Sequence, residues 1–380
     1  MRNNPSRPGG DNQEGGLAMM KFNVRELTEA LTIMSKMNRG VYYRSNLVFL
    51  RTQDGITEVL GTNGLVEIAT EFHTGGDDGK IAVDRKTLLD AVRQVGKEDE
   101  VVTIYKEYNH NIRVSGLNIR VGFKLKTEPI DVDRLTPSSI HMQKVYLREL
   151  AEAFAHVVYA AKETYSTKDV VFILNGKTFY ASDNYRLARY EIEEAYEFPE
   201  ELCISGSAAR LMVEAVKVSK ETIGEIGIAD EMVVVRLGRY TIGLKKEQCA
   251  LPAYEEVLAK EHKTVVYVRA KEMINILKQI KRIDKVKFVH IEIDPANTRF
   301  MKLFSRDVDG TCGSLFLVPL VMLDNRESER VERAFNIQYL LDALSPVEKE
   351  LVALCFPGED DRVDVIWNGY RAMIMAAVLM

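Results

Sequence analysis

Few residues of this chain are spaced as a catalytic or metal site would require. Asp307, Asp309 and Gly310 resemble the start of a calcium loop, but Val318 stands at the twelfth loop position, where a bidentate carboxylate is needed. We therefore expect a hairpin turn there. The six histidines are scattered along the chain, and no phosphate-binding loop or dinucleotide motif is present. The sequence thus predicts no catalytic residue, no cofactor and no metal site, and it favours a protein that is not an enzyme.

The cysteine spacing suggests reduced thiols in a cytoplasmic protein, and the apolar segments suggest neither a membrane span nor a secretion signal. The four cysteines lie far apart and form no Cys-x-x-Cys pair, which is typical of a cytoplasmic protein with reduced thiols. No membrane span is expected, because the apolar run at 315–323 is short and contains Pro319. Residues 1–19 are rich in Asn, Gly, Pro and Ser and lack the apolar core of a secretion signal, so we interpret them as a disordered extension or tag.

Cations follow a clearer pattern, because they gather on segments with helical periodicity. The whole chain has a net charge of −5, yet the segments with helical periodicity are positive in sum. In segment 269–287 four cations fall on one helix face: Lys271, Lys278, Arg282 and Lys285. Apolar residues fall on the opposite face: Met273, Ile276, Leu277 and Ile280. A lysine-rich solvated face would explain one such helix, but a bias over several helices favours contact with nucleic-acid phosphates.

The elements that carry these cations recur along the chain. Similar sequence motifs surround Arg25, Arg148 and Arg269, which lie about 120 residues apart. A second sequence motif recurs at 88–92, 212–216 and 340–344 with nearly the same spacing. This period is the size of a small domain. We therefore predict three similar domains, with boundaries at 20–142, 143–263 and 264–380.

Each repeat has the same predicted order of elements. A helix comes first, followed by several strands of alternating polar and apolar residues, a second helix and further strands of this kind. The helices are predicted near 24–38, 84–96, 147–161, 206–219, 269–283 and 336–344. The strands of the first repeat are predicted at 46–52, 58–62, 66–72, 101–106, 111–115 and 118–126. This order predicts an α+β fold in which each domain packs two helices on antiparallel sheets.

Three segments carry a resemblance to a known family. Residues 181–188 read Ala-Ser-Asp-Asn-Tyr-Arg-Leu-Ala, residues 251–258 read Leu-Pro-Ala-Tyr-Glu-Glu-Val-Leu, and residues 335–344 read Phe-Asn-Ile-Gln-Tyr-Leu-Leu-Asp-Ala-Leu. From about residue 20 to the C-terminus the chain resembles the bacterial DNA sliding clamp, the beta subunit of DNA polymerase III holoenzyme. The resemblance implies a head-to-tail homodimer that closes a ring of six domains, with helices lining the hole. It implies a processivity factor that encircles and slides on duplex DNA in the cytoplasm, at the nucleoid.

The resemblance also implies partners and their sites. The replicative polymerase, the clamp loader and other proteins with clamp-binding motifs would dock in a pocket between the second and third domains. That pocket would contain Val171, Ser182, Asn184, Arg186, Leu187, Pro252, Val257, Met373, Ile374 and Met375. The dimer interface would contain Phe123, Leu125, Ile280 and Ile283. The DNA contacts would be Arg25, Arg39, Arg148, Arg210, Lys217, Lys271, Lys278 and Arg282.

Departures from the family pattern predict an altered partner preference. Tyr185 stands where the family has histidine, Glu256 replaces a basic residue, and the tail at 375–380 lacks the family's proline and arginine. A divergent or second-copy clamp would fit these changes. Two alternatives remain: a metal-dependent nucleic-acid enzyme using Asp307 and Asp309, and a ring-like scaffold that never meets DNA. Retention on circular but not linear DNA, without metal-dependent chemistry, would distinguish the clamp from the enzyme. The scaffold would be favoured if neutralising Lys278 and Arg282 changed nothing.

Overall fold

The computed structural model describes most of the chain, in two compact units. The described residues are 19–37, 45–96, 100–107, 111–116, 123–128, 132–137, 139–164, 167–229, 231–258, 261–306, 312–325, 330–358 and 361–377. The first unit comprises Met1–Pro137 and Gly238–Gly243, and the second comprises Ser138–Leu237 and Leu244–Met380. No helix within the described ranges is long and apolar enough to cross a membrane.

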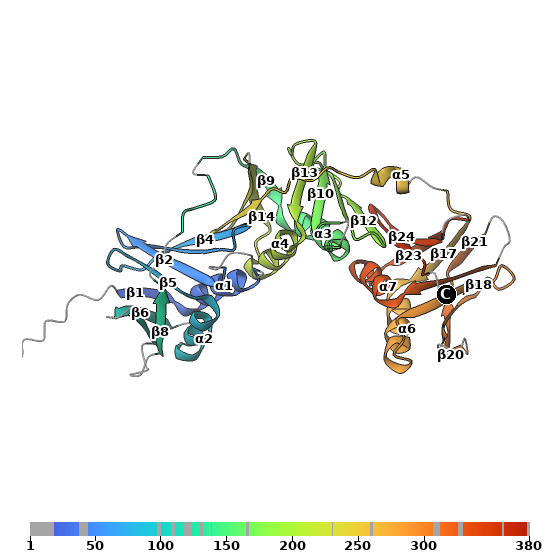
Figure 1. Cartoon of the computed structure of the whole chain (residues 1–380), viewed down its shortest axis with the longest axis horizontal. Coiled ribbons are helices and arrows are strands. Elements are labelled where there is room, and N and C mark those ends of the chain that lie inside the picture. The colour runs from blue at the N-terminus through green and yellow to red at the C-terminus, as the bar shows by residue number, and fades with distance from the viewer. Residues whose placement is uncertain are drawn as a thin grey trace, which may run out of the picture. The chain divides into compact units, whose positions relative to one another are not determined.

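The first unit packs two helices on antiparallel strands (Figure 1). Its elements are β1 (Met19–Asn23), α1 (Val24–Ser35), β2 (Leu47–Gln53), β3 (Ile56–Thr62), β4 (Val66–His73), β5 (Gly79–Asp84), α2 (Arg85–Val95), β6 (Val101–Glu107), β7 (Asn111–Gly116) and β8 (Phe123–Glu128). The strands are ordered β1-β6-β7-β8-β5-β2-β3-β4. Helices α1 and α2 are in contact with each other.

The second unit begins with the same alternation of strands and helices. Its first elements are β9 (Gln143–Tyr146), α3 (Leu147–Val157), the 3-10 helix η1 (Val158–Ala160), β10 (Val170–Leu174), β11 (Thr178–Ser182), β12 (Arg186–Glu191), β13 (Glu201–Ser205), α4 (Gly206–Ser219), β14 (Ile223–Ile228) and β15 (Met232–Leu237). Strand β16 (Tyr240–Lys245) follows β15 in the chain, although its residues up to Gly243 belong to the first unit, and the short helix α5 (Tyr254–Leu258) follows β16. Helices α3 and α4 are in contact with each other.

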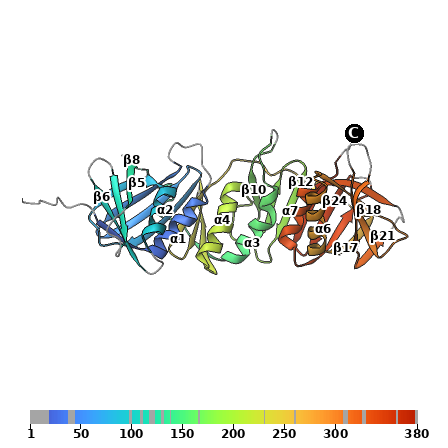
Figure 2. The same cartoon turned by 90° about the horizontal axis from the view of Figure 1, so that it is seen from below.

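The rest of the second unit repeats the plan once more. Its elements are β17 (Thr264–Arg269), α6 (Ala270–Ile283), β18 (Phe288–Ile293), β19 (Phe300–Arg306), β20 (Cys312–Pro319), β21 (Met322–Asn325), β22 (Val331–Asn336), α7 (Ile337–Leu344), the 3-10 helix η2 (Ser345–Val347), β23 (Leu351–Phe356), β24 (Arg362–Trp367) and β25 (Tyr370–Met375). Helices α6 and α7 lie side by side in both cartoon views (Figures 1 and 2).

Two sheets of this unit lie outside the one that contains β9, β14 and β15. The larger is ordered β13-β10-β11-β12-β25-β24-β23-β17-β21, so it joins strands far apart in the sequence through the β12–β25 pair. That pair is antiparallel, with Arg186 opposite Ile374 and Tyr190 opposite Tyr370. The smaller sheet is ordered β20-β19-β18-β22. Because β12 and β25 pair, the strands that carry the predicted pocket residues belong to one continuous sheet.

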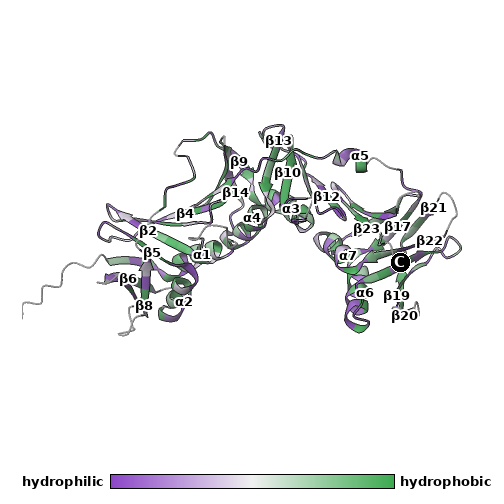
Figure 3. Ribbon diagram, in the orientation of Figure 1, coloured by the Kyte–Doolittle hydropathy of each residue, from purple (hydrophilic) through white to green (hydrophobic). Residues whose placement is uncertain are grey.

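The helix starts and faces follow from the sequence. Asn23, Asp84 and Ser205 each precede a helix, and each side chain accepts a backbone N–H of the first turn, which satisfies a donor that has no partner within the helix. The α6 ribbon carries both polar and apolar residues (Figure 3). Met273, Leu277 and other apolar residues of α6 belong to a buried core, whereas its basic residues are exposed. The predicted separation of the two faces of this helix is confirmed.

The structure confirms the α+β class and the six predicted helices, with ends shifted by a few residues. Strands β1 and β5 were not predicted from the sequence, nor was helix α5, whose five residues are too few for a helical period. Strand β8 is described only from Phe123, because the earlier residues predicted for it lie outside the described ranges, as do residues 1–18.

Candidate functional site

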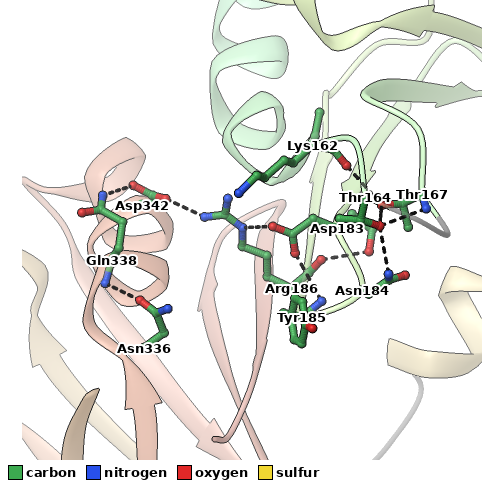
Figure 4. Close-up of polar contacts among 12 residues, drawn as sticks. Lys162, Thr164, Thr167, Asp183, Asn184, Tyr185, Arg186, Asn336, Gln338 and Asp342 are labelled. Atoms are coloured by element: carbon green, nitrogen blue, oxygen red, sulfur yellow. Dashed lines mark hydrogen bonds and ion pairs between the residues drawn. The ribbon is translucent and has the colours of Figure 1, made fainter. Parts of the chain in front are cut away.

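Arg186 joins two segments of the second unit beside the predicted pocket. It begins β12 and is 6% exposed, and its guanidinium donates to Asp183 at 2.9 Å and to Asp342 of α7 at 2.5 Å. The same guanidinium lies 4.4 Å from the centre of the Tyr339 ring. Figure 4 shows the side chain directed toward Asp342, while the neighbouring Asn184 turns toward Thr164. Arg186 therefore holds β12 to α7, and Asp342, the one charged residue of α7, has a structural role in this joint.

A cavity of about 270 Å³ lies next to this joint. Its wall is mainly apolar and aromatic, with one cation. The lining residues are Thr167, Lys168, Val170, Phe172, Ser182, Cys249, Ala250, Pro252 and Tyr254. The Phe172 and Tyr254 rings meet edge to face with centres 6.1 Å apart. An apolar hollow of this size with few polar groups suits a single large side chain of a peptide.

Helix α5 closes one side of the cavity and is held by charged groups. Glu255 accepts from the Tyr180 hydroxyl and from Arg189 Nε at 3.0 Å. Burial and the neighbouring Glu255 carboxylate raise the pKa of Tyr180 to about 12, so the hydroxyl remains a donor at neutral pH. At the other end of α5, Arg362 donates to the carbonyl oxygen of Val257 at 2.7 Å. These contacts fix α5 against β11, β12 and β24.

The predicted pocket residues occupy different places around this cavity. Ser182 and Pro252 line it. Leu187 and Met373 are buried in the apolar cluster that also contains Val170 and Phe172. Two predicted side chains lie on the surface and are available for contact: Val257 is 41% exposed and Met375 is 39% exposed. Asn184 is exposed as well, in a left-handed conformation with a φ of 74°.

Two predicted pocket residues face the wrong way. Val171 and Ile374 are 0% exposed, and neither lines the cavity. Successive side chains of a strand point to opposite faces, so on β10 it is Val170 and Phe172 that reach the cavity. Ile374 likewise belongs to the main core of the second unit. On β10 the predicted residue is therefore one position away from the residues that line the cavity, whereas on β25 the predicted run 373–375 includes one residue that points to the other face.

The predicted cations are mostly exposed on helices. Lys271, Lys278 and Arg282 are exposed on α6, and the last two line a hollow of about 530 Å³ beside α7. Arg25 is exposed on α1. Arg39 lies outside the described residues.

Three other predicted cations have carboxylate partners. Arg148 and Lys217 are exposed, with partners on their own helices, Glu152 at 2.9 Å and Glu214 at 3.1 Å. Arg210 binds both carboxylate oxygens of Asp169 and two backbone carbonyls, so its guanidinium already has a structural role. Exposed ion pairs are weak, so Arg148 and Lys217 can exchange their partners for phosphates more readily than Arg210.

Some of the residues predicted for a dimer interface are exposed and others are buried. Ile280 is 0% exposed in the core of the second unit, so the prediction that it contacts another subunit is wrong. Ile283, one helix turn later, is 56% exposed. On β8, Leu125 is 8% exposed, and the side chain of Phe123 lies outside the described part. Strand β20 was not predicted from the sequence. It is an edge strand that contacts α6, and its Leu315 and Leu317 are 55% and 51% exposed.

No metal site is found in the described ranges, where no group of three or more His, Cys, Asp or Glu residues is placed to hold an ion. Asp307 and Asp309, the ligands of the alternative enzyme hypothesis, lie outside the described residues.

Comparison with known proteins identifies the fold. No protein-family model matches the chain. It is 23% identical over 330 residues to a protein named beta sliding clamp from Buchnera aphidicola subsp. Rhopalosiphum padi, covering 81% of this chain and 84% of the relative. It is 21% identical over 336 residues to the beta sliding clamp of Haemophilus influenzae, covering 82% and 84%. The crystal structure of the DNA polymerase III beta subunit from Thermotoga maritima superposes with a TM-score of 0.80 at 19% identity, covering 96% of this chain and all of the other.

The fold is that of the DNA clamps, with helix pairs packed on antiparallel sheets. Within that class, the resemblance to the bacterial sliding clamp, the beta subunit of DNA polymerase III, is confirmed by both sequence and fold.

Proposed function

We propose that this chain is a non-catalytic processivity factor that encircles duplex DNA and tethers a DNA polymerase to it. The observation that carries the proposal is the exposed cationic face of α6, formed by Lys271, Lys278 and Arg282, on a chain with a net charge of −5. Contacts from such a face to phosphates do not read sequence and are weakened by salt, which permits sliding. The relatives named beta sliding clamp support the same function.

The ring would form from three domains in each of two copies. We propose domain boundaries at 20–142, 143–263 and 264–380, supported by three pairs of contacting helices, α1 with α2, α3 with α4, and α6 with α7. In the homodimer, residues 123–126 of β8, which pair with β7 on one side while the last two residues of β8 pair with β5, would meet β20 and the end of α6 in the other copy, burying Ile283, Leu315 and Leu317. Exposed edge strands with apolar side chains favour such pairing.

Partner proteins would dock at the cavity walled by Phe172, Ser182, Pro252 and Tyr254. Polymerases, clamp loaders and other proteins with clamp-binding motifs are the proposed partners, and the proposed location is the cytoplasm, at the nucleoid. A short fluorescein-labelled peptide ending in Leu-Phe, called the probe peptide below, would insert an apolar side chain into the cavity. Val257 and Met375 would contact the rest of it.

The experiment that tests the ring is retention on DNA. The protein is incubated with nicked circular duplex and separated from free protein by gel filtration, and the DNA is then cut by a restriction enzyme. We expect the protein to remain on the circle and to dissociate after the cut. The double variant Lys278→Glu/Arg282→Glu should remain a dimer but be retained less. Equal retention on circular and linear DNA would contradict encirclement, and equal retention of the variant would favour a scaffold that does not use this face.

A further inference from the structure

Two thiols meet at the wall of the docking cavity. Cys249 lines the cavity and is partly exposed. Cys203, on β13, is 6% exposed and belongs to the apolar cluster against which Cys249 packs. Both are free thiols. The cavity thus places an accessible cysteine in front of a buried one, although they are far apart in the sequence.

The backbone brings the two segments into register. Ile204 forms an isolated antiparallel bridge with Lys246, and the Glu247 N–H donates to the Cys203 carbonyl at 2.8 Å. Cys249 follows two residues after this contact, and its thiol is close enough to Cys203 to contribute, by charge and by hydrogen bonding, to the raised pKa of Cys203. A disulfide needs Cα atoms within about 7 Å. Residues 247–253 belong to no strand or helix, so Cys249 can approach Cys203 without breaking a strand ladder.

We propose that Cys203 and Cys249 form an oxidisable dithiol that a hydroperoxide converts to a disulfide, which narrows the docking cavity. The formation of the disulfide is independent of the proposed function, whereas its effect on docking depends on that function. Ala250 and Pro252 closely follow Cys249 in the chain and line the cavity. Drawing Cys249 toward β13 therefore moves part of the cavity wall.

The chemistry balances with the hydroperoxide as the oxidant. The Cys249 thiolate attacks the distal peroxide oxygen, the O–O bond breaks, and water or an alcohol leaves after protonation, which gives a sulfenic acid. The Cys203 sulfur then attacks the Cys249 sulfur, the S–O bond breaks, and water leaves. The two thiols lose two electrons and two protons. Burial raises the pKa of Cys203, so the partly exposed Cys249 is the thiol that meets the oxidant first.

The test combines thiol mapping with docking. The full chain is treated with hydrogen peroxide, alkylated, digested without reductant and analysed by mass spectrometry. We expect a peptide linked through Cys203 and Cys249, loss of two of the four thiols, and reversal by a phosphine reductant. Cys203→Ser and Cys249→Ser should each abolish the link, while Cys355→Ser, which removes another buried thiol, should keep it. The linked protein should bind the probe peptide about tenfold more weakly than the reduced protein.

Different failures are distinguishable. The dithiol is disproved if peroxide leaves both thiols free, or if Cys249 oxidises further while Cys203 remains free. A linked protein that binds the probe peptide as tightly as the reduced one would disprove the effect on the cavity. A reduced protein that does not bind the probe peptide at all would instead contradict the proposed docking function, and the mapping would still decide whether the disulfide forms.

Discussion

The guanidinium of Arg186 stacks on the ring of Tyr339, 4.4 Å from its centre, and thereby joins strand β12 to helix α7. The same group neutralises Asp183, whose side chain is 1% exposed, and reaches Asp342. Buried charges are tolerated only when they are paired. Arg186 therefore does more to hold the pocket region together than to contact a docked partner, although the family resemblance predicted it as a pocket residue.

Removing this cation should destabilise the second unit strongly. Arg186→Met leaves Asp183 buried without its charged partner, so we expect the free energy of unfolding to fall by about 3–5 kcal/mol in a urea titration. Adding Asp183→Asn should recover part of the decrease, because the buried charge is then removed. The control is Arg148→Met, since the Arg148–Glu152 pair is 85% and 47% exposed and should contribute less than about 1 kcal/mol.

Stability should decline on the acid side of neutrality because of His156. Its ring is 8% exposed, stacks on Tyr190 at 4.2 Å and lies parallel to Trp367 at 6.4 Å, while Nδ1 bonds to the Glu152 carbonyl. Burial lowers its pKa below the usual value, so the unfolded chain binds the proton more readily than the folded one. The folded state therefore loses stability as the pH falls below about 6.5, by at most about 1.4 kcal/mol per pH unit for this proton.

Thermal unfolding between pH 7.5 and 5 checks this dependence. His156→Phe keeps an aromatic ring in the stack but cannot titrate, so its midpoint should depend less on pH than that of the unchanged protein. His141→Gln, at an exposed position, is the matched control and should leave the dependence unaltered. If the unfolding midpoint of the His156 variant depends on pH as that of the unchanged protein does, the acid sensitivity belongs to another group.

The basic face of α6 should set the salt dependence of DNA binding. Replacing one cation that neutralises a phosphate should reduce the slope of log affinity against log salt by about 0.9. Lys278→Ala and Arg282→Ala should each show this effect on a short duplex in fluorescence anisotropy, equally for different sequences. Arg210→Ala should affect folding stability more than the slope, because Arg210 is bound to Asp169. Slopes that stay constant in both α6 variants would exclude this face from DNA contact.

The end of α6 should be needed for dimerisation. Ile283→Asp places a charge at the proposed interface, so sedimentation should detect a shift toward monomer, with a dissociation constant raised at least about tenfold. Ile223→Asp is a matched control, since Ile223 and Ile283 are 55% and 56% exposed but only the latter lies at the proposed interface. Equal effects of the two substitutions would argue against the β8–β20 contact.

Docking should depend on the exposed side of α5. Val257→Asp introduces a charge where an apolar contact is expected and should weaken binding of the probe peptide about tenfold or more in fluorescence anisotropy. Leu65→Asp, at an exposed position of the first unit, should not. Tight binding by the Val257 variant would place the docking surface elsewhere.

The sequence predicted long periodic elements well and single side-chain directions poorly. Helix α6 was predicted at 269–283 and found at Ala270–Ile283, because its apolar and basic faces alternate over several turns. Val171 lies on a strand, where an error of one position turns a side chain to the other face, and Ile374 is the inward-facing member of the predicted run 373–375. The thiol pair at the cavity could not have been predicted, because Cys203 and Cys249 meet only through a single bridge between distant segments.

The ladder between β12 and β25 also has a mechanical consequence. Its strands run antiparallel with five paired positions, from Arg186 opposite Ile374 to Tyr190 opposite Tyr370. Force applied along these strands, for example by a polymerase moving with its tether, would load all of those hydrogen bonds at once in shear. The docking region should therefore require a higher force to unfold than the chain segments that lead into it.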